Sequence, residues 1–66
     1  MNKFQMNSIT VEVTYGRRLE VFSIPTKGTD ASAEAYALAT AKHWMDGKAQ
    51  YKWNTTPEQC TYKVKK

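Results

Sequence analysis

The sequence predicts a small α+β domain, in which an antiparallel sheet of three or four strands carries one helix across one face. Three observations indicate this fold. Polar and apolar side chains alternate from residue 8 to residue 15, as they do in a half-buried strand. The alanine-rich stretch from residue 31 to residue 44 has the spacing of an amphipathic helix. Alternation returns after Gly47, so we expect the order strand, strand, helix, strand, strand.

The length and composition bound the architecture. A chain of 66 residues forms a single domain with one modest core. The single cysteine, Cys60, excludes an internal disulfide and favours a reducing compartment. Residues 1–10 contain no long apolar run, so we expect neither a secretory signal nor a membrane span, and we predict a cytoplasmic location. Residues 1–7 and 65–66 are expected to fray.

The first two strands are predicted to form a hairpin. Ile9, Val11, Val13 and Tyr15 lie on one side of the first strand by alternation. Gly16 supplies the positive φ that a tight turn needs, which puts Arg17 and Arg18 near the hairpin tip. The run "LEVFSI" resumes strand character, and Pro25 is expected to end it.

The helix is predicted from about Ala31 to Asp46, with Asp30 or Thr29 as its N-cap and Gly47 as its stop. Helical spacing gives a packing stripe that comprises Glu34, Leu38, Ala41 and Met45, widened by Ala33, Ala37 and Trp44. Tyr36 and His43 lie two turns apart on the opposite side. They form either a partner-contact spot or an ordinary solvated face.

After Gly47 the pattern returns to period two. "AQYKWN" and "CTYKVKK" both alternate, and "TTPEQ" between them reads as a turn centred on Pro57. These runs predict a second hairpin. The alternative is one irregular strand with a frayed tail.

One helix covers one face of a sheet, so the other face is open unless a partner covers it. The second predicted strand is apolar on both sides, with Leu19 and Val21 on one and Phe22 and Ile24 on the other. An exposed Phe22 ringed by Lys52 and Lys63 would form a binding surface. Alternatively, a β-bulge near Ser23 turns Ile24 inward and leaves Phe22 as a single surface aromatic. Pairing of two open faces or edges would make a homodimer.

The net charge of +4 lies entirely in the second half of the chain. Such asymmetry indicates an acidic protein partner, nucleic acid, or a solubilising lysine face. By strand parity, however, the aromatic and lysine side chains of residues 51–65 point to opposite faces, which argues against a surface that both stacks on bases and contacts phosphates. Nucleic-acid binding therefore stays an alternative.

Nothing in the sequence predicts catalysis or a cofactor. Asp46, at i+3, is a possible carboxylate neighbour of His43, but it is more naturally a residue of the helix C-terminus. Cys60 falls on the inward side of its strand, where an inert thiol is usual. The His, Cys and acidic residues have no metal-site spacing, and the glycines at 16, 28 and 47 form no phosphate-binding loop. We therefore predict a non-enzymatic protein without a metal.

The order of strand, tight turn, strand, "TDASAEAYALATAKHW" and final strand resembles that of small phage-encoded inhibitors. These include the T7-type inhibitor of bacterial RNA polymerase and short anti-CRISPR proteins. The resemblance spans Ile9 to Val64 and has no diagnostic motif, and the lysine-rich end departs from the polymerase inhibitor's pattern. It implies a stoichiometric, anti-defence or host-directed blocker in the host cytoplasm, with no turnover.

We accordingly expect an inhibitor or adaptor that binds a protein with an acidic surface, as a monomer or a homodimer. The predicted contact residues are Arg17, Arg18, Phe22, Lys52, Lys63, Tyr36 and His43.

Overall fold

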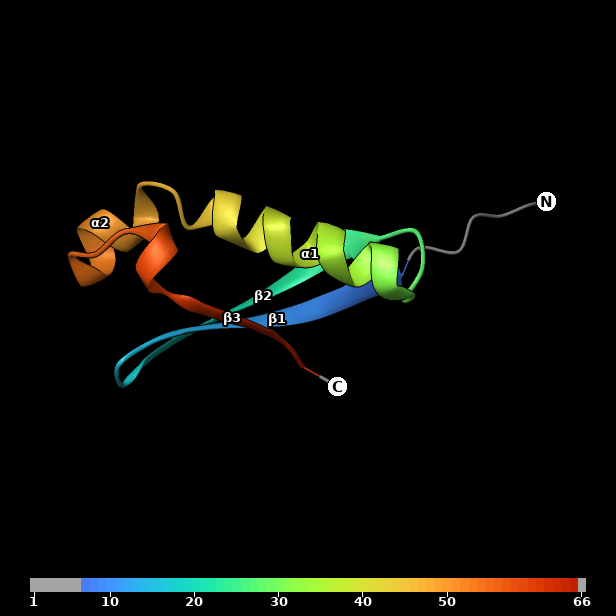
Figure 1. Ribbon diagram of the computed structural model, residues 1–66, viewed down its shortest axis with the longest axis horizontal. Helices are drawn as coiled ribbons and strands as arrows, with labels where there is room; N and C mark the ends of the chain where they lie inside the picture. Colours follow the sequence, from blue (N-terminus) through green and yellow to red (C-terminus); the bar gives the residue numbers. More distant parts are fainter. Residues whose placement is uncertain (1–6, 66) are drawn as a thin grey trace.

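The computed structural model describes residues 7–65 and shows an α+β domain with a three-stranded antiparallel sheet and one main helix. Its elements in chain order are β1 (Asn7–Tyr15), β2 (Arg18–Thr26), α1 (Ala31–Trp44), α2 (Lys48–Trp53), the 3₁₀ turn η1 (Pro57–Gln59) and β3 (Thr61–Val64). The strand order is β2-β1-β3 (Figure 1), so β1 is central and both β2 and β3 are edge strands.

The predicted first hairpin is confirmed. Tyr15 pairs with Arg18, so Gly16 and Arg17 form a two-residue turn. Gly16 has a φ of 62°, which suits the first central position of a type II′ turn. Pro25 does not end β2, which continues to Thr26. An edge strand tolerates proline where its missing N–H would face away from the sheet.

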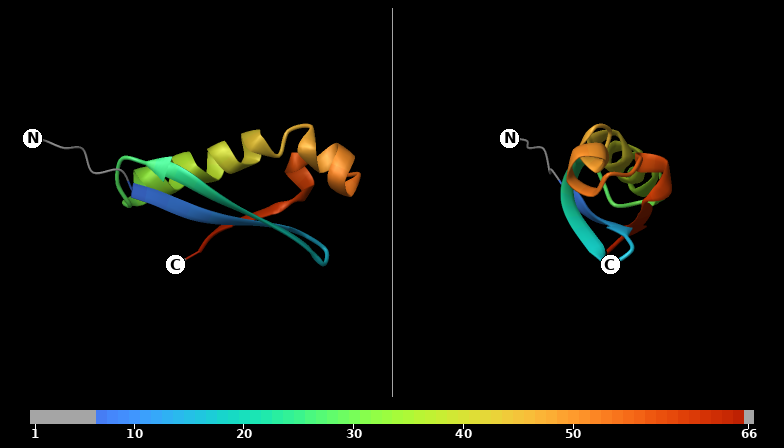
Figure 2. Two further views of the ribbon diagram at one scale, coloured as in Figure 1. Left: turned by 180° about the vertical axis from the view of Figure 1, so that it is seen from behind. Right: turned by 90° about the vertical axis from the view of Figure 1, so that its left-hand side faces the viewer.

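The helix α1 begins where the sequence predicts. The backbone N–H of Ala33 donates to the Asp30 side chain at 3.0 Å, which makes Asp30 the N-cap. Ala37, Ala41 and Met45 are fully buried against the sheet, as the predicted stripe requires. The small side chains of Ala37 and Ala41 let this helix lie close to the sheet. α1 runs along one face of the sheet (Figure 2), and the opposite face has no covering layer within residues 7–65.

The core lies between α1 and the sheet. Val11, Val13, Ile24 and Met45 are its largest fully buried side chains. Cys60 is buried as predicted, immediately before β3. Two contacts tie the ends of the described chain to the sheet: Asn7 pairs with Thr26, and the Lys65 N–H donates to the Thr10 carbonyl at 2.8 Å. The rest of the predicted frayed ends, residues 1–6 and 66, lies outside the described residues.

The predicted strand "AQYKWN" is wrong, because residues 48–53 form the helix α2. The sheet therefore has three strands in the described part of the chain, and the second hairpin is absent there. Six residues fit period two and a helical turn equally well, since Ala49 and Trp53 are also spaced to share a helix face. Left-handed residues bound the helix, with Gly47 at φ 81° and Asn54 at φ 53°. Pro57 opens η1 within the predicted turn.

Candidate functional site

The uncovered face of the sheet presents two large apolar side chains. Leu19 is 56% exposed and Val21 is 50% exposed, both on edge strand β2. Across the sheet, Thr14 lies opposite Leu19 and Glu12 lies opposite Val21. We call Leu19 and Val21 the β2 apolar pair. In the described part of the uncovered face, this pair interrupts the polar pattern set by the β1 residues beside it.

Phe22 lies on the other face, so its predicted exposure is wrong. It is 9% exposed and packs edge-to-face on Trp44 of α1, with ring centroids 5.4 Å apart. The Lys48 ammonium lies 5.1 Å from the centre of the Phe22 ring, a cation–π distance. The pairing of β1 with β2 runs unbroken through Ser23, so no bulge turns Ile24 inward alone. Phe22 and Ile24 both face α1, and Leu19 and Val21 take the open side.

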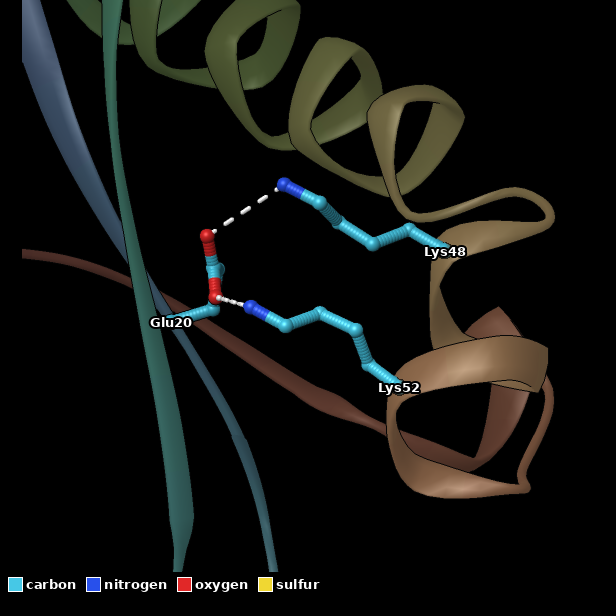
Figure 3. Close-up of polar contacts among 3 residues, drawn as sticks. All are labelled: Glu20, Lys48 and Lys52. Carbon is cyan, nitrogen blue, oxygen red and sulfur yellow. Dashed lines mark hydrogen bonds and ion pairs between the residues drawn. The ribbon is translucent and has the colours of Figure 1, made fainter.

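Lys52 also lies away from the uncovered face. It is on α2, where its Nζ is 3.1 Å from Glu20 Oε1, and Lys48 Nζ is 3.3 Å from Glu20 Oε2 (Figure 3). Hydrogen bonds from these lysines hold the pKa of the Glu20 carboxyl below its usual range, against the opposing effect of burial. We call Glu20, Lys48 and Lys52 the lysine clamp. It joins α2 to β2 and is part of the scaffold.

Lys63 lies on the predicted face. It is exposed on β3 and pairs in register with Glu12 of β1. Because Phe22 and Lys52 lie on the helix side, the predicted surface of Phe22, Lys52 and Lys63 does not form. Lys63 instead shares the uncovered face with the β2 apolar pair.

Arg17 and Arg18 are exposed at the hairpin tip, as predicted. Within residues 7–65 neither has an ion-pair partner. Their guanidinium groups can make bidentate bonds with carboxylates. The tip lies at one end of the uncovered face, next to Leu19 in the chain.

Tyr36 and His43 are exposed on the outer side of α1, again as predicted. They are carried by α1, on the helix side of the sheet, whereas Lys63 lies on the uncovered face. Tyr36 also lines an open cleft of about 550 Å³ with Pro25, Thr26 and Lys27. Asp30 borders this cleft, but its carboxylate already caps α1.

The described residues bring together no reactive pair. Cys60 Sγ lies 3.6 Å from the Thr56 carbonyl oxygen, and burial raises the pKa of this thiol, which keeps it protonated. His43 is exposed on the outer side of α1, whereas Cys60 is buried. Within residues 7–65, no three His, Cys, Asp or Glu side chains are grouped as metal ligands, and no helix is long and apolar enough to cross a membrane.

The exposed pair could have been identified from the sequence by carrying the register outward from the turn. With Gly16 and Arg17 as the turn, Tyr15 pairs with Arg18 and Val11 pairs with Phe22. Side chains of directly paired residues lie on the same face, so Phe22 follows Val11 into the core. Trp44, which the sequence places on the packing stripe, is 42% exposed. This exposure has no such signal, because it depends on where α1 ends over β2.

In comparisons with known proteins, no family model, no curated protein and no solved structure matches this chain.

Proposed function

We propose that this chain is a non-catalytic protein-binding module that acts by occupying the surface of a partner. The observation that carries the proposal is the exposure of the β2 apolar pair on the uncovered face of the sheet. Exposed apolar groups that are bordered by charged residues are typical of interfaces. Leu19 and Val21 have Arg17 and Arg18 at one end and share their face with Lys63.

The charges favour an acidic partner. Arg17, Arg18 and Lys63 are exposed and have no ion-pair partner within the described residues. Lys48 and Lys52, by contrast, already pair with Glu20. Available cations therefore lie both at the hairpin tip and on the uncovered face, beside the β2 apolar pair. Carboxylates of a partner would meet them there while its apolar side chains cover Leu19 and Val21.

We further propose that this module acts as an inhibitor. Its support is the element order that resembles phage-encoded inhibitors of host or defence proteins. A blocker of this kind needs a contact surface and no reactive groups.

Nucleic-acid binding is the second candidate, and the exposed ring of Tyr51 favours it. Tyr51 is 76% exposed on α2 and would offer a base a stacking surface. Its two neighbouring lysines are held by Glu20, however, and Trp53 stacks on Tyr15 with ring centroids 6.5 Å apart. The paired lysines make α2 a poorer surface for phosphate, and the stacking of Trp53 inside the fold leaves one ring fewer for bases, than its composition suggests.

The proposal is tested by capture from bacterial lysate with the tagged chain, with and without nuclease. We expect one or two proteins in stoichiometric amount in both samples. Two double variants, Arg17→Glu with Arg18→Glu and Leu19→Ser with Val21→Ser, should each lose the captured protein. His43→Ala, an exposed residue on α1, is the control and should retain it.

Two results would contradict the proposal. Loss of all captured proteins on nuclease treatment would favour nucleic acid, and retention by both double variants would exclude the proposed surface. Phe22→Ser is unsuitable as a test because it removes a buried ring from the core and would unfold the chain.

A further inference from the structure

We infer that the partner binds as an extended segment that adds a strand to the outer edge of β2, with acidic residues at both ends of that segment. This inference rests on the proposed protein-binding function and specifies its geometry. It depends on three observations, which are the backbone groups at the β2 edge, the apolar side chains on both sides of that edge, and the charges at its two ends.

The register of the sheet identifies the free backbone groups. The Lys65 N–H donates to the Thr10 carbonyl, so the backbone groups of Thr10 face β3. Backbone direction alternates along an antiparallel strand, so Val11 and its odd-numbered neighbours bond to β2. Their partners there are the even-numbered residues, such as Phe22. The N–H and C=O groups of Leu19, Val21 and Ser23 therefore point outward, away from β1.

This edge is suited to a new strand over residues 19–23. Pro25 has no N–H to offer and closes the available stretch at one end, and the turn at Gly16 and Arg17 closes it at the other. Unpaired edge groups of this kind are a template for strand addition. Backbone hydrogen bonds would supply affinity, and side chains at alternate positions would supply specificity.

Apolar surface flanks the edge on both sides. Leu19 and Val21 lie on the uncovered face, and on the other face Trp44 covers Phe22 while remaining 42% exposed. A strand laid along β2 would direct its side chains alternately toward these two surfaces. The segment therefore needs apolar residues on both of its faces, at least near Val21.

The charges at the two ends of this edge favour an acidic segment over a second copy of the chain. Arg17 and Arg18 precede the free edge, and exposed Lys27 follows it. If two copies paired antiparallel about Val21, Arg17 of each copy would lie within two residues of Lys27 of the other. Like charges in such proximity disfavour a homodimer. An extended segment with carboxylates at both ends meets the same cations favourably.

The experiment uses the full chain, labelled with ¹⁵N, and a synthetic peptide with the sequence Asp-Glu-Val-Ile-Val-Ile-Val-Glu-Asp, which is apolar on both faces. At saturation we expect amide hydrogen exchange at Leu19, Val21 and Ser23 to slow by about tenfold or more, because each gains a backbone hydrogen bond. A peptide with lysine in place of each aspartate and glutamate should leave these amides unchanged. Ser23→Pro removes one edge N–H and should weaken binding, whereas Ser23→Ala keeps it and should bind as the unchanged chain does.

The outcomes separate this inference from the proposed function. Peptide-induced shifts at the Leu19 and Val21 methyl groups without protection of the edge amides would mean docking on the face, which overturns strand addition and leaves the protein-binding function standing. Equal binding by Ser23→Pro and Ser23→Ala, or no binding of the acidic peptide, would also overturn strand addition. A sedimenting dimer with the edge amides already protected would assign the edge to a second copy. The function itself fails only if the lysate experiment fails.

Discussion

Glu20 is the residue on which the position of α2 depends. Its carboxylate is 20% exposed and accepts from two lysines of a helix that follows it by more than twenty residues in the chain. Partly exposed ion pairs contribute little individually, but two on one carboxylate with a cation–π contact to Phe22 form a small network.

We therefore expect Glu20→Gln to lower the free energy of unfolding at pH 7 by about 0.5–1 kcal/mol. The Glu20 pKa is lowered in the folded state, so its contribution is present above the unfolded-state value of 4.5 and is lost as pH falls through the folded-state pKa. Urea unfolding at pH 7 and at successively lower pH checks both points. The exposed Glu58→Gln is the control, and an equal loss in both variants would contradict a role for the clamp.

Tyr62 fixes the turn η1 to β3 by donating its hydroxyl to the Pro57 carbonyl oxygen at 2.7 Å. Burial raises the pKa of Tyr62 to about 12. Between the ordinary value of 10.0 and about 12, the unfolded chain ionises this phenol and the folded chain does not, so stability falls across that range. We expect Tyr62→Phe to lose about 1 kcal/mol at pH 7 and to show a shallower decline above pH 10. Denaturant unfolding across this pH range measures it, and parallel declines would disprove the assignment.

At the scale of elements, the sequence predicts the hairpin and α1 well because each has a local determinant. Gly16 sets the turn, and Asp30 caps a long alanine-rich run. The helix α2 was not predictable from its own six residues, since its alternation fits a strand. What selects the helix is distant in sequence, because Lys48 and Lys52 both reach Glu20 and Trp53 stacks on Tyr15.

The C-cap of α2 gives a test of this local geometry. Asn54 has a φ of 53°, a left-handed conformation in which glycine is favoured over side chains that branch at Cβ. We expect Asn54→Gly to be neutral or to raise the midpoint of thermal unfolding, and Asn54→Val to cost about 1–2 kcal/mol. Circular dichroism melting measures both. Thr56 is the control, because it has an extended φ of −114° and Thr56→Gly should therefore lower the midpoint of unfolding. If both glycine variants raise the midpoint, the left-handed conformation of Asn54 does not explain the effect.

For the whole molecule, the predicted arrangement of one helix on one face of the sheet holds, and so does the expectation that one side of β2 is left exposed. The candidate site changed because the choice between Phe22 and the β2 apolar pair depends on register. The candidate site also lost Lys52, because residues 48–53 form α2 and place Lys52 on the helix side of the sheet. Arg17, Arg18 and Lys63 keep their predicted places because these depend on the local turn at Gly16 and on the alternation of residues 60–64.

The β2 apolar pair distinguishes what the fold needs from what a partner would need. Leu19 and Val21 are half exposed, so Leu19→Thr with Val21→Thr keeps strand propensity and should change the free energy of unfolding by no more than about 0.5–1 kcal/mol. Ile24→Ala, on the same edge strand but at a position that is 1% exposed, should cost about 2–4 kcal/mol. Urea unfolding compares the two. If the threonine variant loses as much free energy of unfolding as Ile24→Ala does, the pair is part of the core. Near-neutral stability together with loss of partner capture would instead leave binding as the reason for two apolar side chains in water.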